Sequence, residues 1–153
     1  MNATHADPSD PGQVFKGAVI SGVINAVING GIQYFMLKDS STIAMSVDSI
    51  STKTHTVLGS AVPLAVSLAM ILTAVAYWTL KTSKIPFFPR IFWMVIRHGL
   101  MAFGGIVTFA VLWQRFVGTV EVGLGTAVVV LGIVAGLIAT VVNYLTILEA
   151  VKK

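Results

Sequence analysis

The residues best suited to polar chemistry lie inside the first long apolar stretch of the chain. Their side chains recur every four residues, at Ser21, Asn25, Asn29 and Gln33. Because a step of four residues turns an α-helix only about 40° beyond a full turn, these side chains form one stripe. An amide that faced lipid would lose its hydrogen bonds at a cost of about 1–3 kcal/mol. The stripe is therefore expected to face other helices, a partner or water.

Two interpretations of this stripe stay open. In the first, the side chains hold helices together through hydrogen bonds, which in membrane proteins contribute only about 0.6 kcal/mol each on average. In the second, they line a pathway or binding site for a polar solute. Small residues with the spacing that lets another backbone approach closely lie beside the stripe and in the fourth apolar stretch, at Gly22, Ala26, Gly30, Gly132 and Gly136. Packing within the bundle and dimerisation are both compatible with them.

A second polar group is expected where the third and fourth apolar stretches meet the same membrane surface. Arg97 lies about 9 Å along the helix from Ile91, by the helical rise. Its side chain is long enough to reach the lipid headgroups, or it pairs with Glu149. His98 is a candidate proton carrier, or else a hydrogen-bonded structural residue.

The sequence lacks the residues and motifs that thiol chemistry, phosphate binding, common hydrolase mechanisms and nucleic-acid binding require. The chain has no Cys, which excludes disulfides, thiol nucleophiles and cysteine-ligated metals. It contains no glycine-rich phosphate loop and no HExxH or GxSxG motif. Basic residues do not cluster with aromatic ones, so no nucleic-acid partner is expected. We predict no metal, no cofactor and no enzyme activity; an enzyme would have to rely on Arg97, His98, Glu149 or the loops.

The composition indicates that lipid surrounds most of the chain. Hydrophobic residues make up 56% of the 153 residues and charged residues only 10%, whereas soluble domains carry about 25% charged residues. A helix needs roughly 20 apolar residues to cross about 30 Å of hydrocarbon, and backbone groups in lipid must bond internally. Stretches of that length lie at 14–37, 57–80, 91–113 and 123–148. The predicted fold is an all-α integral membrane bundle of four transmembrane helices.

The remaining segments divide this bundle into two helical hairpins. The first hairpin spans 14–80, with a polar loop at 38–56, and the second spans 91–148, with a short loop between its helices. A short basic segment at 81–90, containing Pro86 and Pro89, separates the two hairpins. Polar tails at 1–13 and 149–153 complete the chain, and the first is expected to be disordered.

The orientation in the membrane follows from the positions of Lys and Arg. Positive charge is enriched in cytoplasmic segments. The tails, the middle loop and the adjoining helix ends hold Lys16, Lys81, Lys84, Arg90, Arg97, Lys152 and Lys153, and the opposite side holds Lys38, Lys53 and Arg115. We therefore expect both termini in the cytoplasm and the chain in the cell membrane (inner or plasma membrane).

The two hairpins resemble each other in sequence. The segment 58–62 reads LGSAV and the segment 124–128 reads LGTAV. The segments 73–79 and 140–146 share a Thr–x–x–x–Tyr–x–Thr pattern, and the first and third stretches both contain a Gly–Gly pair. A duplicated hairpin would give two units that point the same way across the membrane. Chance similarity between apolar helices is the alternative.

Two functions from different classes fit these observations. The first is a small transporter or channel for a small polar solute, in which the stripe of Ser21, Asn25, Asn29 and Gln33 lines the path. The second is a non-catalytic accessory or scaffold subunit of a larger membrane complex. Besides the lipid bilayer, the expected partners are further copies of the chain or another membrane protein.

Overall fold

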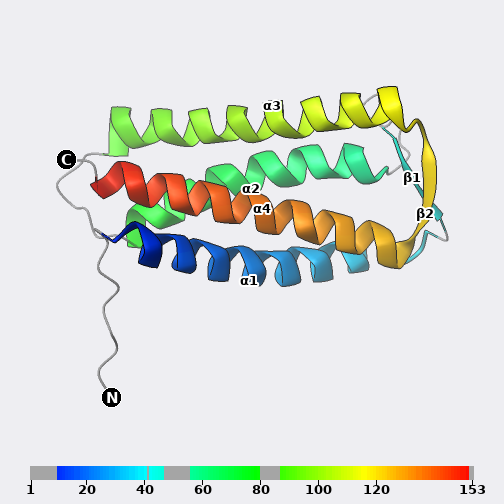
Figure 1. The fold of residues 1–153 in the computed structure, drawn as a ribbon, viewed down its shortest axis with the longest axis horizontal. Helices are drawn as coiled ribbons and strands as arrows, with labels where there is room; N and C mark the ends of the chain where they lie inside the picture. The colour runs from blue at the N-terminus through cyan, green and yellow to red at the C-terminus, as the bar shows by residue number, and fades with distance from the viewer. Residues whose placement is uncertain (1–9, 41, 47–55, 80–86, 152–153) are drawn as a thin grey trace, which may run out of the picture.

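The computed structural model describes residues 10–40, 42–46, 56–79 and 87–151. Four long helices dominate it: α1 (Pro11–Leu37), α2 (Val57–Thr79), α3 (Phe92–Phe116) and α4 (Leu124–Val151). Figure 1 shows them as one elongated bundle. Each helix is long and apolar enough to cross a bilayer. The fold is therefore that of a multi-pass membrane protein built on a helical bundle, as the composition predicted.

Local sequence signals explain where two of these helices begin and end. α1 begins at Pro11, before the predicted Val14, because Asp10 caps it: the Gly12 backbone N–H donates to Asp10 Oδ1 at 2.9 Å. α3 continues past residue 113 to Phe116, and a short kinked segment, η2 (Phe87–Ile91), precedes it, with extended backbone at Phe88. Gly118 ends α3 with φ of +81°, and its N–H donates to the Trp113 carbonyl oxygen. Most of the predicted tail 1–13 and of the segment 81–90 lies outside the described residues.

The helices of the two predicted hairpins interleave in space. The extensive helix contacts are those of α1 with α4, α4 with α2, and α2 with α3. Figure 1 shows the resulting order, with α3 and α1 at the two edges of the bundle. α4 therefore lies between α1 and α2, and α2 lies between α4 and α3. The pairs α1–α4 and α2–α3 are both antiparallel and both join the two hairpins.

Apolar side chains fill the contact between the two central helices. On α4 they are Ala127, Leu131, Ala135, Ala139 and Val142, and on α2 they are Ala61, Ala65 and Ala69; all are buried. The alanines bring the two backbones close, and the larger side chains fill the remaining space. Close packing of this kind leaves the axis of the bundle lined by apolar groups.

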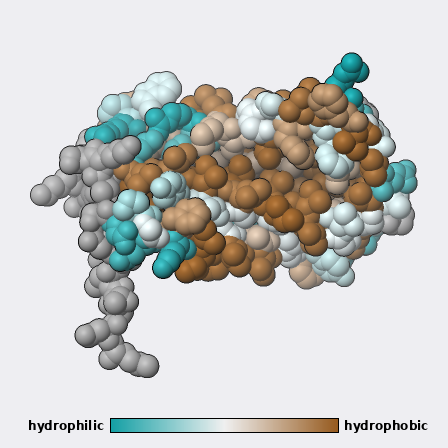
Figure 2. Space-filling model, in the orientation of Figure 1, coloured by the Kyte–Doolittle hydropathy of each residue, from teal (hydrophilic) through white to brown (hydrophobic). Residues whose placement is uncertain are grey.

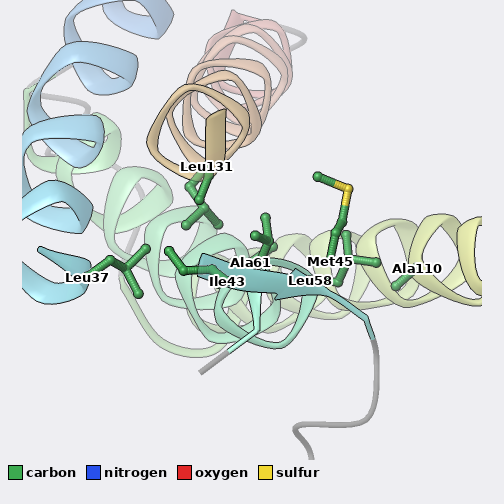
Figure 3. Packing of buried hydrophobic residues seen from close by; sticks show 9 residues of the cluster. Leu37, Ile43, Met45, Leu58, Ala61, Ala110 and Leu131 are labelled. Carbon is green, nitrogen blue, oxygen red and sulfur yellow. The ribbon is translucent and has the colours of Figure 1, made fainter. Parts of the chain in front are cut away.

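A small sheet covers one end of the bundle, which we call the sheet end. β1 (Thr42–Met45) pairs antiparallel with β2 (Val120–Gly123), with Ile43 opposite Val122. Ile43 and Met45 are buried against a cluster that includes Leu37 and Leu58 (Figure 3). The sequence predicted only loops here. Each strand has four residues, too few to reveal an alternating pattern before its partner is known.

The opposite end, which we call the terminal end, holds the start of α1 and the end of α4 (Figure 1). Between the two ends, Figure 2 shows an apolar surface on the visible face, with hydrophilic residues gathered toward the ends. Large exposed hydrophobic side chains such as Val27 and Phe35 on α1, Leu100 on α3 and Leu137 on α4 contribute to the apolar surface of the bundle. Such a surface suits contact with acyl chains.

Candidate functional site

The amide face, defined as Ser21, Asn25, Asn29 and Gln33, lies along the seam where α1 packs on α4. Gln33 is buried and the other three residues are half-buried. Each Asn comes one residue before a small residue of that seam, Ala26 or Gly30, so its side chain projects to one side of the contact. The face is neither fully exposed to lipid nor fully covered by α4.

The two asparagines of the amide face donate hydrogen bonds to their own helix. Asn25 Nδ2 donates to the Ser21 carbonyl oxygen and Asn29 Nδ2 to the Asn25 carbonyl oxygen, both at 2.9 Å. Within the described part of the chain, neither asparagine side-chain carbonyl accepts a hydrogen bond, and the Gln33 amide makes none. The face therefore offers unused acceptor atoms in a region from which lipid excludes water.

One member of the amide face is bonded across the seam. The Asn143 amide of α4 donates to the Ser21 hydroxyl oxygen. Thr140, on the same helix, donates to the Gly136 carbonyl oxygen at 2.9 Å and lies directly against Gly22. Asn143 was not among the predicted site residues, although it is an amide inside a long apolar stretch, which is the same signal that indicated Asn25.

Small residues let the backbones of α1 and α4 touch along this seam. A Cβ atom on Gly22 would stand 2.7 Å from the Gly136 carbonyl oxygen. One on Gly132 would stand 3.0 Å from the Ala26 carbonyl oxygen, and Gly30 lies against the Gly132 Cα. The five small residues predicted for helix packing therefore meet each other inside one chain.

A shallow apolar groove of about 330 Å³ lies on the other side of the seam. It is lined on α1 by Ala26, Val27, Gly30 and Gly31 and on α4 by Val128, Val129, Gly132 and Ile133. No residue of the amide face lines it. The two sides of α1 next to α4 thus differ in chemistry: one offers hydrogen-bond acceptors and the other only apolar surface.

The predicted polar group at the terminal end brings α3 and α4 together. The Arg97 guanidinium donates to Glu149 Oε1, and the two side chains are 60% and 39% exposed. The partner of Arg97 is thus a carboxylate 52 residues away in the chain. An ion pair this exposed contributes little to stability, about 0–1 kcal/mol.

His98 lies beside this ion pair in the chain but faces the interior. Its side chain is 1% exposed, and its Nδ1 atom is 2.9 Å from the Thr73 hydroxyl oxygen of α2. The Nε2 atom is buried and has no hydrogen-bond partner within the described residues. Thr73 was not among the predicted site residues, because a threonine in an apolar helix is common and its partner lies on another helix.

The described residues contain no group of three His, Cys, Asp or Glu side chains that could hold a metal ion. Comparison of the chain with protein-family models, curated proteins and solved structures finds no match.

Proposed function

We propose that the protein is a small membrane transporter or channel for a neutral polar solute and that the amide face of α1 forms one wall of the path. The observation that carries this proposal is the pair of half-buried asparagine side chains, Asn25 and Asn29, whose carbonyl oxygens accept no hydrogen bond within the described residues. Polar groups without partners are costly inside a membrane. A passing solute or a file of water molecules would supply the missing donors.

The chemistry of the amide face favours a solute that donates hydrogen bonds. The asparagine Nδ2 groups already donate to backbone carbonyls, so the hydrogen-bonding positions left for a solute are mainly acceptors. None of the four side chains is ionisable, which favours a neutral solute over an ion. Small alcohols, amides and water have this chemistry.

The path is expected to run beside the bundle rather than through its axis. Buried alanine, leucine and valine side chains fill the contact between α2 and α4, and α1 packs chiefly on α4. A path along α1 therefore needs a second wall that a single chain does not supply. A further copy of the protein, with its own amide face, would provide it, so the proposal includes a homo-oligomer.

Flux through reconstituted vesicles tests the proposal. The purified protein is placed in liposomes, and the entry of urea and of glycerol is followed by stopped-flow light scattering. We expect entry of at least one of the two to be faster than in empty liposomes. The double substitution Asn25→Leu and Asn29→Leu should bring the rate down toward that of empty liposomes, because it removes both acceptors.

The matched control changes the neighbouring lipid-facing positions. Ile24 and Ile28 each precede one of the asparagines and are more than half exposed. The double substitution Ile24→Leu and Ile28→Leu should leave flux unchanged. Circular dichroism must show that both variants are folded. If the asparagine variant and the isoleucine variant then gave equal flux, the amide face would not be part of the path.

An accessory or scaffold subunit is the second candidate, and the closely packed apolar axis of the bundle favours it. In that case the free asparagine carbonyls bond to a helix of another membrane protein. The wild-type protein would then give no flux with either solute, and one partner would copurify in mild detergent. The same Asn25→Leu and Asn29→Leu variant would lose that partner.

We also propose that both termini lie in the cytoplasm, on the Lys and Arg distribution described above. Positive charge is present at both ends, with Arg97 near the terminal end and Arg115 near the sheet end. The orientation therefore depends on which end carries more Lys and Arg residues. Cysteines introduced singly at residue 5 and residue 118 test the orientation, because the natural chain has none. In intact cells, a membrane-impermeant maleimide should label only the second; labelling of only the first would reverse the topology.

Finally, we propose that the two hairpins arose by duplication. Exchanging α1 with α3 and α2 with α4 leaves the set of main helix contacts unchanged. Phe15 of α1 packs edge-on against Tyr144 of α4, and Phe87 of η2 packs in a similar manner against Tyr77 of α2, both with ring centroids 5.9 Å apart. The two halves of the bundle should superpose by a rotation of about 180° around the membrane normal. A much smaller rotation would contradict the proposal.

A further inference from the structure

The Thr73–His98 contact decides which nitrogen of the His98 ring carries the proton in the neutral state. The Thr73 hydroxyl donates its only hydrogen to the Ala69 carbonyl oxygen, at 2.7 Å. The same hydroxyl oxygen lies 2.9 Å from His98 Nδ1, and both contacts are hydrogen bonds at once only if this oxygen accepts from an Nδ1–H group. With both bonds made, neutral His98 carries its hydrogen on Nδ1, and Nε2 keeps a free lone pair.

That lone pair has no donor within the described residues. His98 is 1% exposed, and no side chain or backbone group of the described residues hydrogen-bonds to Nε2. A buried acceptor without a partner is unfavourable, and in native structures it calls for an explanation. Because His98 is almost completely shielded from solvent, a proton is a suitable ligand for this atom, since it requires no added volume.

Charged groups near the ring are placed to influence its protonation. Burial of the ring has the largest effect and opposes its charged form; the Glu149 carboxylate of α4 and the Arg97 guanidinium of α3 also act electrostatically on His98. On α2, the ring neighbour is the neutral Thr73, and the titratable Tyr77 packs against Ile91 and Val95. The carboxylate favours a charged imidazolium and the guanidinium opposes it. The two are themselves joined as an ion pair at the terminal end.

We propose that His98 Nε2 is a proton-binding site inside the bundle, and that Glu149 stabilises the charged ring in competition with its ion pair to Arg97. The proton comes from water at the terminal end, where His98 lies about 9 Å along α3 from Phe92. It adds to the Nε2 lone pair, and no other bond is made or broken. Charged His98 attracts the Glu149 carboxylate and weakens its hold on Arg97. This site is separate from the amide face and does not depend on solute transport.

Nitrogen NMR of the histidine ring tests the proposal directly. The chain has three histidines, and substituting His5→Gln and His55→Gln leaves His98 as the only imidazole. This protein, labelled with ¹⁵N-histidine, is reconstituted in lipid bilayers and recorded from about pH 8 to about pH 4, which brackets the ordinary imidazole range. We expect one neutral form at pH 8, protonated on Nδ1 only, and a second form at acidic pH, protonated on both nitrogens.

Variants of the flanking charges sharpen the test. At a fixed acidic pH, Glu149→Gln should lower the fraction of doubly protonated His98, and Arg97→Gln should raise it. Glu121→Gln, at the sheet end, is the matched control and should change nothing. A ring that stays neutral down to pH 4 in folded protein, a neutral form protonated on Nε2, or equal effects of the Glu149 and Glu121 substitutions would each overturn the proposal.

Discussion

The seam between α1 and α4 and the seam between α2 and α3 are two antiparallel helix pairs that reach close contact in opposite ways. Along α1–α4, side chains are missing: Gly22 and Gly136 face each other, and a Cβ on Gly22 would meet the Gly136 carbonyl oxygen at 2.7 Å. Along α2–α3, side chains fill the contact. A Cβ on Gly99 would meet the Met70 Cγ at 2.9 Å, and Thr73 bonds to His98.

The difference lies in what can move when a side chain is added or removed. A backbone carbonyl in a helix cannot shift without moving the helix, whereas a methionine side chain has several rotatable bonds. At Gly22 the α1–α4 seam is therefore expected to tolerate no added atom, whereas the α2–α3 seam is expected to adapt at Gly99. Loss of a hydrogen bond should instead destabilise the α2–α3 seam more than the α1–α4 seam, since the Thr73–His98 bond is fully buried.

The largest effect is expected from Gly22→Ala. The added methyl group would collide with the Gly136 carbonyl oxygen and with Thr140, so α1 must move away from α4. We expect the free energy of unfolding to fall by about 2–3 kcal/mol, at the upper end of overpacking costs. The measurement is unfolding by SDS in mixed micelles, followed by circular dichroism. Gly31→Ala, where nothing lies within 4 Å of the added atom, is the control, and an equal loss there would contradict the contact.

An intermediate effect is expected from Thr73→Val. The substitution removes the acceptor of the His98 Nδ1–H and leaves that group buried and unpaired. Hydrogen bonds inside membrane proteins are modest, so we expect a loss of about 1 kcal/mol in the same SDS assay. Thr79→Val removes a hydroxyl that bonds to its own helix, at the Val75 carbonyl oxygen, and is exposed. If both variants lost the same free energy of unfolding, the bond to His98 would contribute nothing to stability.

The smallest effect is expected from Gly99→Ala. The new methyl group meets only the flexible Met70 side chain and, at 3.9 Å, Val66. Since methionine adapts its rotamer readily, we expect the free energy of unfolding to change by less than about 0.5 kcal/mol. A loss as large as that of Gly22→Ala would show that the two seams do not differ in rigidity.

The sequence predicted the helices well because the signal for a membrane helix is local. A long apolar stretch without charge, such as 57–80, identifies a span without knowledge of its neighbours, and α2 occupies Val57–Thr79. α1 begins before the predicted Val14 because its capping signal, Asp10–Pro11, lies outside the apolar stretch. The polar stripe of α1 was likewise predictable from the sequence, since its four-residue spacing depends only on the helical period.

Only the tertiary structure shows which helices pack against each other. Nothing in the stretches themselves places α4 between α1 and α2, because that choice depends on which surfaces fit, such as Gly22 against Gly136. The pairing of β1 with β2 joins segments far apart in the chain, and so does the contact between Thr73 and His98. Hydrophobic length is a property of each segment alone, whereas shape and hydrogen-bond complementarity exist only between two segments. The amino-acid sequence thus determined the membrane spans, and the tertiary structure determined the seams and the partners of their polar groups.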